Sequence, residues 1–478
     1  MKRSDSKYDV VIIGAGIGGL VCGCYLAKAG MKVLIIEKND KVGGCCVSFK
    51  RGRFRFDAGA HIIGSCNARG VMHNLLRRLN IDQKFIRMEP AEQMHFPYHT
   101  IKIPSDYKSY ICLLQNLFPN EKKIEKFFEV IIKISRLTAY RNEEFADLTY
   151  QQLLDRYLRD DKLKAILSGQ AGFLGVTPAN VAAVPMSAML VSYLRDGAYY
   201  QYGGAGSLAE KLKDRFKMLG GKVCVNTYAT DIQTNKLGLN KVVAKDKKNY
   251  EYVFYSDKIV SDIDMRYTLF NLLKKKEMPK DIAQIVKHST ETPSLKILYI
   301  GTKLNKNIIA KKTGWHFSSY DINKTFIDCV YITAPSLYDT SATAQGFSVL
   351  EVFQMTSKDE ASARGDKISY KKNLEERLLK RLFQIIPELK NNVIVKEFAT
   401  PRTIENFTGN RDGSVYGWAL TVGQYRRNES IARELYKYIQ FVGHWTNPGG
   451  GVLSVAISGY NTARNIMRKN EREFLNVY

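Results

Sequence analysis

The chain lacks the residue groupings on which several kinds of folding and catalysis depend. Its eight cysteines include no CxxC pair at zinc-ligand spacing, and no Ser, His and Asp grouping typical of hydrolases is visible. Cys45 and Cys46 are adjacent, but a redox dithiol needs a second cysteine a few positions on, and the next one is Cys66. We therefore predict no metal site, no disulfide scaffold and no hydrolytic nucleophile.

Internal repeats, low-complexity tracts and long linkers are absent too, which favours two domains for the 478 residues. The segment from Met1 to Asp5 is polar and unlike a secretory signal, so we expect a cytoplasmic protein. The segment from Val10 to Ala27 carries no charge and is long enough to span a bilayer. Its glycines lie at loop spacing, however, and favour a buried strand followed by a helix.

The chain has fewer acidic than basic residues, and its net charge is +25. The basic residues are scattered along the chain without stacking aromatics beside them, so we expect no nucleic-acid partner. Two interpretations of the charge stay open. One is attraction to an anionic membrane surface, which would place the protein peripherally on the inner face of the cell membrane; the other is a lysine-rich composition without a dedicated partner. The sequence does not indicate the oligomeric state.

The first informative feature that is present is a glycine-rich loop between an apolar strand, predicted over 10–13, and a helix, predicted over 20–29. Gly14 permits a tight turn, Gly16 admits a diphosphate close to the backbone, and the helix N-terminus offers free N–H groups. A strand predicted over 33–36 then delivers an acidic residue suited to a ribose diol. The pattern predicts a dinucleotide site that includes Gly14, Gly16, Ile17, Gly18, Gly19, Glu37 and Lys38.

A second glycine pair, Gly43-Gly44, follows the ribose-binding strand, and Asp57-Ala58-Gly59-Ala60-His61 comes soon after it. A second close backbone approach is required by the long, extended FAD molecule and is usually missing from NAD sites. The added site residues are Gly43, Gly44, Gly59, Ala60 and His61, and the predicted cofactor is FAD.

Another glycine-rich segment lies near the end of the chain, where Phe441-Val442-Gly443-His444-Trp445 runs into Pro448-Gly449-Gly450-Gly451-Val452. We expect the two ends of the chain to form one cofactor site. The predicted contacts from this end are Gly443, His444, Gly451, Val452 and Leu453.

From Tyr8 to His61 the chain resembles the flavin amine oxidases and carotenoid desaturases. The segment Tyr199-Tyr200-Gln201-Tyr202-Gly203-Gly204, the run around Gly169–Pro178 and the carboxy-terminal segment through Ser458-Gly459-Tyr460 extend the likeness to the carotenoid desaturase, carotenoid isomerase and retinol saturase branch. This resemblance spans nearly the whole chain. It implies bound FAD, with a backbone group near Ala229 at the adenine. The chain departs from the branch at Cys45-Cys46, where many relatives have Arg, and at His444, where many flavoproteins have Asp.

The resemblance also implies the fold class: an α/β chain with a Rossmann-like FAD-binding domain (GR2-type flavoprotein) interleaved with a mixed α+β substrate domain. We assign 1–95, 203–265 and 430–478 to the first domain and 96–202 and 266–429 to the second, with 100–200 mainly helical. Strands are predicted over 294–300, 326–332 and 347–353, and a helix over 371–384. The basic, strongly apolar helix around 124–134 is either a core helix or a membrane-contacting one.

The function implied is that of an FAD-dependent oxidoreductase acting on carbon–carbon bonds of an apolar polyene or isoprenoid lipid. Desaturation, saturation and isomerisation leave the same sequence pattern, and only one dinucleotide loop is present, so a stable NADPH site is not expected. His61 is a candidate acid or base, but a hydrogen bond to the cofactor or backbone is the favoured role, and no catalytic residue is assigned. A flavin amine oxidase and a non-enzymatic prenyl-lipid binding protein of GDP dissociation inhibitor type are the alternatives.

Overall fold

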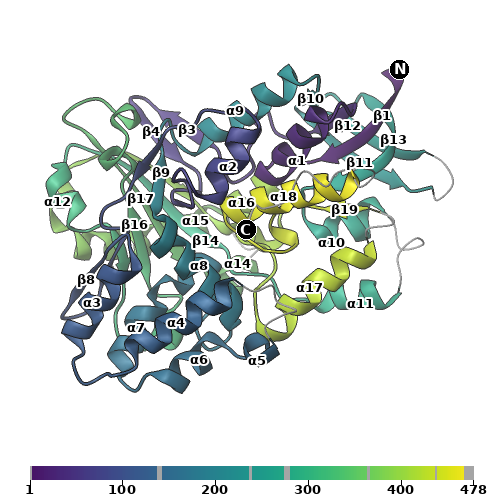
Figure 1. Cartoon of the computed structure of the whole chain (residues 1–478). Helices are drawn as coiled ribbons and strands as arrows, with labels where there is room; N and C mark the ends of the chain where they lie inside the picture. Colours follow the sequence, from purple (N-terminus) through teal and green to yellow (C-terminus); the bar gives the residue numbers. More distant parts are fainter. Residues whose placement is uncertain are drawn as a thin grey trace.

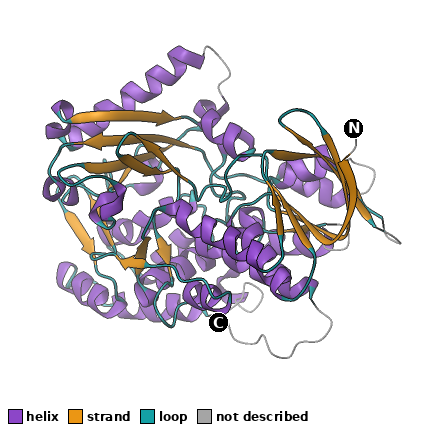
Figure 2. Cartoon of the chain, turned by 90° about the horizontal axis from the view of Figure 1, so that it is seen from above, coloured by secondary structure: helices purple, strands orange, loops and turns teal. Residues whose placement is uncertain are grey.

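The computed structural model describes residues 3–136, 143–235, 239–273, 280–362, 367–435 and 439–467, so the end of the predicted 430–478 segment lies outside the described residues. Two seven-stranded sheets lie on opposite sides of the molecule (Figure 1), and Figure 2 shows them from above as two separate groups of strands. Two smaller sheets pair β3 (Ser48–Arg51) with β4 (Phe54–Asp57), and β9 (Ala198–Gln201) with β5 (Ile63–Gly64) and β6 (Phe85–Arg87).

The first large sheet contains the glycine-rich loop. Its order is β10-β2-β1-β13-β12-β11, and β19 pairs with β13. The strands on either side of β1 are parallel to it, whereas β12 runs in the opposite direction and pairs antiparallel with both β13 and β11. Its members are β1 (Arg3–Ile13), β2 (Val33–Ile36), β10 (Lys222–Cys224), β11 (Thr227–Gln233), β12 (Asn240–Asp246), β13 (Glu251–Ser261) and β19 (Gln440–Phe441).

Helices cover both faces of this sheet, which explains why Val10–Ile13 and Val33–Ile36 are apolar throughout and buried. On one face α1 (Ile17–Lys28) packs against α18 (Val452–Ile466), and a side chain at Gly459 would come within 2.3 Å of the Gly18 carbonyl oxygen. The absence of a side chain at Gly459 therefore lets the last helix lie close to the first. The other helices of this part are α2 (Val71–Arg78), α9 (Ala205–Met218), α10 (Met265–Tyr267), α11 (Lys280–His288) and α17 (Val422–Leu435).

The second large sheet has the order β18-β14-β17-β16-β15-β7-β8 and is mostly antiparallel. Its members are β7 (Glu92–His95), β8 (Thr100–Ile103), β14 (Leu295–Thr302), β15 (Gly314–His316), β16 (Val330–Thr333), β17 (Ser348–Met355) and β18 (Val393–Ala399). The predicted strand over 326–332 is shorter in the structure, because the short helix α13 (Ile322–Thr325) continues into a turn in which the Asp328 and Cys329 N–H groups donate to the Thr325 carbonyl oxygen. The helix predicted over 371–384 is α15 (Lys367–Ile385), whose apolar side packs on one face of this sheet.

A group of helices covers the other face. It consists of α3 (Tyr107–Leu117), α4 (Ile124–Ser135), α5 (Glu143–Ala146), α6 (Tyr150–Tyr157), α7 (Asp161–Ser168) and α8 (Ala183–Asp196). The shorter helices elsewhere are α12 (Lys306–Ala310), α14 (Lys358–Ser362) and α16 (Pro401–Thr408).

The apolar stripe of α4 decides between the two interpretations of that helix. Phe127, Ile131 and Ile134 are fully buried in the core shared with the second sheet. The core-helix interpretation is therefore correct, and the membrane-contacting one is wrong for this stripe, since its side chains are already covered by protein. Among the described helices, none combines the length and the apolar character needed to cross a bilayer.

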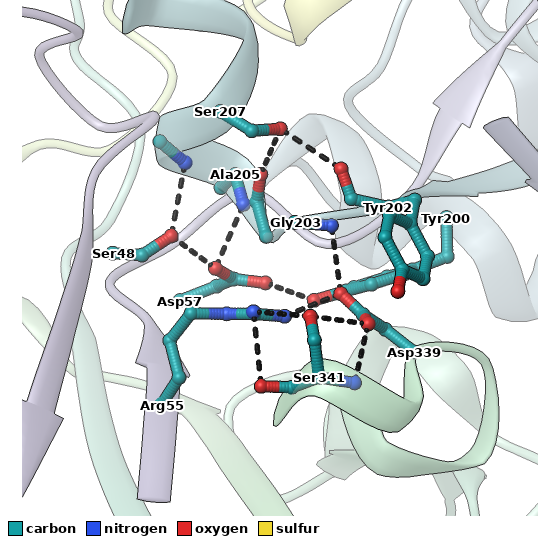
Figure 3. A network of polar contacts seen from close by, with 12 residues as sticks. Ser48, Arg55, Asp57, Tyr200, Tyr202, Gly203, Ala205, Ser207, Asp339 and Ser341 are labelled. Carbon is teal, nitrogen blue, oxygen red and sulfur yellow. Dashed lines mark hydrogen bonds and ion pairs between the residues drawn. The ribbon is translucent and has the colours of Figure 1, made fainter. Parts of the chain in front are cut away.

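A buried polar network ties the β3–β4 hairpin to the rest of the chain (Figure 3). Asp57 accepts hydrogen bonds from the Ser48 hydroxyl at 2.6 Å, the Tyr200 hydroxyl at 2.6 Å and the Ala205 N–H at 2.7 Å. Arg55 forms an ion pair with Asp339 at 2.5 Å, and the exposed fractions of their side chains are 11% and 0%. The network thus joins residues from three distant stretches of the sequence.

The Arg55–Asp339 pair generates a stability prediction. Asp339 also accepts hydrogen bonds from the N–H groups of Gly203 and Ser341, so its neutralisation leaves Arg55 without its counter-charge in a desolvated place. We expect Asp339→Asn to lower the free energy of unfolding by about 3 kcal/mol, measured by urea denaturation. The matched control is Glu129→Gln, which removes an exposed ion pair with Lys126 and should change nothing measurable. Equal effects of the two variants would contradict the prediction.

Candidate active site

A cavity of about 960 Å³ is lined by residues from both large sheets and from both ends of the chain. Of the residues predicted from the sequence, its lining includes Gly14, Gly16, Ile17, Gly18, Glu37, Lys38, Gly43, Gly44, Gly59, Ala60, His61, Ala229, Gly443, His444, Gly451 and Val452. Two predicted residues lie outside the lining. The Gly19 N–H donates to Asp262, and Leu453 packs against the core around α18.

The glycine-rich loop presents free backbone donors to this cavity. Gly16 precedes α1 in an extended conformation and has no side chain with which to cap the helix, and of the first N–H groups that of Gly19 donates to Asp262. The first N–H groups of such a helix are available to an anion. Glu37 supports the loop, because its Oε2 accepts a hydrogen bond from the Ala15 N–H at 2.9 Å while its Oε1 accepts one from the Asn39 N–H. Burial raises the pKa of Glu37, whose side chain also faces the cavity.

Asp262, just after β13, lies where the two chain ends meet. It accepts a hydrogen bond from the Gly19 N–H at 2.9 Å, and a side chain at Gly16, Gly18 or Gly443 would come within 2.9 Å of one of its carboxyl oxygens. Burial raises the pKa of Asp262 to about 7, and the nearby Glu37 adds to the rise. A neutral Asp262 can lie beside bound phosphates, whereas a charged one would repel them.

At the other end of the cavity His61 is surrounded by aromatic rings. Its ring stacks on Tyr331 and lies close to Phe353, with centroids 4.9 Å and 4.8 Å apart. His61 Nδ1–H donates to the Gly59 carbonyl oxygen at 3.0 Å, and burial lowers the pKa of His61 to about 4. The imidazole is therefore neutral near pH 7, as a hydrogen-bonding role requires.

A small adjoining cavity of about 30 Å³ continues from this end, and both cavities share His61, Phe173 and Tyr416. We call the region around it the aromatic chamber. Its lining is Gly59, His61, Gly172, Phe173, Leu295, Trp315, Cys329, Tyr331, Phe353, Met355 and Tyr416. This lining is almost without charge, so it would contact an apolar ligand that extends from the larger cavity.

The departure at His444 has a structural counterpart. Asn410 Nδ2 donates to His444 Nε2 at 3.2 Å, and burial lowers the pKa of His444 to about 4. Asn410, which also lines the cavity, thereby holds the neutral ring in place. At the other departure, burial raises the pKa of Cys45 to about 11, so this thiol is not a thiolate at neutral pH.

Sequence reasoning missed Asp262 and the wall of the aromatic chamber. A signal for Asp262 was available, since it follows a strand parallel and adjacent to β1, where loop-facing residues collect. No such signal marked Tyr331, Phe353 and Trp315, because an aromatic residue in a buried strand cannot be distinguished from an ordinary core residue by its sequence.

The sequence of this chain is similar to those of several known proteins. Residues 12–79 match the family model described as "NAD(P)-binding Rossmann-like domain". Prolycopene isomerase 2 from an Oncidium hybrid cultivar is 24% identical over 96% of this chain and 84% of that protein. All-trans-retinol 13,14-reductase from Danio rerio is 24% identical over 87% of this chain and 78% of its own length.

The chain is homologous to these two groups of proteins. The resemblance inferred from the sequence is thus confirmed. Among solved structures, an oxidoreductase from Methanosarcina mazei superposes with a TM-score of 0.69 at 17% identity, covering 96% of this chain and 100% of that one. A putrescine oxidase variant gives 0.68 at 16% identity, over 97% and 99%. These structural matches confirm the α/β, Rossmann-like fold.

The position of Asp262 predicts a pH dependence of nucleotide binding. The carboxyl is neutral below its folded pKa of about 7 and ionised above it, so affinity for a diphosphate-containing cofactor should fall as the pH rises through this value. We expect Asp262→Asn, which cannot ionise, to keep its affinity at alkaline pH. The measurement is cofactor absorbance retained after desalting over a pH series.

The control for this experiment is Asp214→Asn, at an exposed position on α9. It should reproduce the pH profile of the unmodified protein. A profile in Asp262→Asn that falls in the same pH range as that of the unmodified protein would count against the role given to Asp262.

Proposed function

We propose that the protein is an FAD-dependent oxidoreductase that acts on carbon–carbon bonds of an apolar polyene or isoprenoid lipid. The observation that carries this proposal is the homology to a prolycopene isomerase over 96% of the chain. The site geometry agrees with it, because a nucleotide cavity continues into an aromatic chamber with almost no charge. Desaturase, saturase and isomerase activities share these requirements.

The residues present fit an extended FAD. The backbone of Gly14–Gly19 would hold the diphosphate, Glu37 a ribose and the backbone near Ala229 the adenine, while Gly59–His61 and Gly443–Leu453 would lie along the ribityl chain and the ring system. The N–H groups of the first turn of α1 that Asp262 does not engage, and glycines at which a side chain would collide with Asp262, would form the cradle that such a ligand needs. When bound, a flavin supplies hydride exchange.

The residues of the chain have three tasks in this proposal. The aromatic chamber positions the double bonds and excludes water. His61 stays neutral and orients the chamber wall through its stacking on Tyr331. The glycine cradle brings cofactor and chamber together. When the cofactor carries out the electron transfer, the main role of the protein is to position the substrate and the cofactor.

The strands support the domain division proposed above, since β1, β2, β10–β13 and β19 fall in 1–95, 203–265 and 430–478. Two helices do not fit it, because α11 and most of α17 pack on the first sheet but fall in 266–429. Most strands of the second sheet fall in the proposed substrate domain, with only β7, which starts at Glu92, inside the first range. Peripheral binding to an anionic membrane on the cytoplasmic side stays part of the proposal, supported by the net charge of +25.

An amine oxidase is the alternative that the structural likeness to putrescine oxidase suggests. A non-enzymatic prenyl-lipid carrier is the other, and it would carry no flavin. Both alternatives enter the test below.

The central test is anaerobic photoreduction of the bound flavin followed by the addition of carotenoid, retinoid and amine candidates. A saturase would reoxidise its reduced flavin with a polyene, and a desaturase would lose the oxidised flavin spectrum when its substrate is added. An isomerase would change the polyene's absorbance without net flavin change. Reduction of the oxidised flavin by amines alone would replace the proposal with the amine oxidase, and a preparation without flavin absorbance would favour the carrier.

Flavin content should depend on Gly16. A side chain there would lie 2.6 Å from Asp262 Oδ2 and would fill the approach to the backbone, so we expect Gly16→Ala to lose at least about 10-fold in FAD affinity. Gly30→Ala is the matched control, because a side chain at Gly30 meets nothing within 4 Å. The only cost expected in that variant is backbone strain from the positive φ at position 30, so it should keep its flavin. Flavin-to-protein absorbance ratios give the comparison, and equal ratios for both variants would contradict the assignment of the loop.

A further inference from the structure

Glu92, the first residue of β7, is a buried carboxyl group that the proposed function does not yet use. Only 5% of Glu92 is exposed. β15 lies between β7 and β16, and its Trp315 is paired with Met94 on one side and with Tyr331 on the other. Since side chains alternate along a strand, Glu92 shares the sheet face of Met94, Trp315 and Tyr331. Glu92 is therefore on the same face of the sheet as Trp315 and Tyr331 of the chamber lining, but it is not itself part of that lining.

Only one of the two carboxyl oxygens of Glu92 is hydrogen-bonded, so the other can carry a proton. Its Oε1 accepts a hydrogen bond from the Gln93 N–H at 2.9 Å, while its Oε2 has no hydrogen bond of normal geometry. The Tyr331 hydroxyl is the side-chain group close enough to favour the ionised form. Tyr193 and Tyr338 are the other titratable groups whose pKa values respond to Glu92. Burial raises the pKa of Glu92 to about 8, so the carboxyl carries its proton at neutral pH.

Tyr331 connects this carboxyl to the chamber. Its buried ring belongs to the chamber lining and stacks on His61, while its hydroxyl group lies beside Glu92. His61 is a poor proton donor by comparison, because burial lowers its pKa to about 4 and its Nδ1–H is already given to Gly59. The described residues of the chamber lining include no carboxyl group of their own.

We propose that Glu92 is the proton reservoir of the aromatic chamber and exchanges its proton with the substrate through the Tyr331 hydroxyl group. The inference rests on the proposed function. In the saturating direction one carbon of a double bond receives a hydride equivalent, of the kind that a reduced flavin supplies, and its neighbour receives the Tyr331 proton. Tyr331 takes the proton of Glu92, which becomes a carboxylate. Desaturation runs the same transfers in reverse. Because Glu92 acts through Tyr331, it is a positioning residue.

Three variants test the proposal in the flavin-loaded protein. Glu92→Gln removes the proton, and Tyr331→Phe removes the connection but keeps the Glu92 proton. Glu351→Gln is the matched control, since Glu351 is a second fully buried carboxyl on this sheet, raised in pKa by burial, but it contacts the Asp57 N–H and is not part of the chamber lining.

The first readout needs no turnover. Infrared difference spectra over a pH series should show a protonated carboxyl group that ionises near pH 8, separate from that of Asp262 near pH 7, in the unmodified protein and in Glu351→Gln. In Tyr331→Phe this group should ionise at a higher pH, because the lost hydroxyl favours the ionised form, and in Glu92→Gln it should be missing. If Glu92→Gln retains the signal, or if the unmodified protein lacks it, the proposal is overturned. This readout stands even if no polyene reacts, in which case the proposed function fails by itself.

The second readout is proton transfer to carbon. In heavy water, deuterium incorporation into the reacting polyene should slow about 100-fold in Glu92→Gln and Tyr331→Phe, while Glu351→Gln stays near the original rate. The pH profile of turnover should lose its break near pH 8 in Glu92→Gln. Wild-type rates and an unchanged profile in either chamber variant, with normal flavin content, would overturn the proposal. If Glu92→Gln fails to fold, Tyr331→Phe decides by the same measure.

Discussion

The close approach of the first and last helices is the constraint on which the site depends. α1 can lie against α18 because Gly459 has no side chain, which would collide with the Gly18 carbonyl oxygen, and the missing side chain of Gly18 lets Gly443 and Asp262 approach α1. This contact brings the glycine-rich loop and the Gly443–Gly451 segment to the same cavity, with Asp262 between them. Without it, the helix N-terminus would still offer its donors, but the far half of a long cofactor would have no wall.

Several carboxyl and imidazole groups at and near the cavity are uncharged at neutral pH, and burial explains this. Asp262, Glu92 and Glu351 all have raised pKa values because desolvation penalises their ionised forms, and the buried His61 and His444 have lowered ones for the same reason. Neutral acids can donate protons and lie beside phosphates, and neutral imidazoles can accept hydrogen bonds. A low-charge interior therefore serves both a diphosphate cofactor and an apolar substrate.

The Arg55–Asp339 ion pair keeps its charges although it is buried, as the Lys296–Glu360 pair does, and it has a different task. It lies in the network that links the β3–β4 hairpin to the segments around Gly203 and Ser341, away from the aromatic chamber. Its charges are tolerated because the two groups pair with each other and form further hydrogen bonds with Gly203 and Ser341, although Arg55 Nε has no hydrogen-bond partner. The hairpin directly precedes Gly59 and His61, so a rigid hairpin keeps these residues in register with the cavity.

The sequence by itself determined the nucleotide half of the molecule. The loop from Gly14 to Gly19, its flanking strand and helix, and Glu37 act over short distances in the chain, so their spacing was enough to predict their placement around one cavity. The tertiary structure alone decided the other half. Tyr331, Phe353 and Trp315 come from separate strands, and their alignment on one face depends on the order and register of a mixed sheet. The orientation of α4 and the burial of Glu92 follow from packing between distant segments, which periodicity along the chain does not encode.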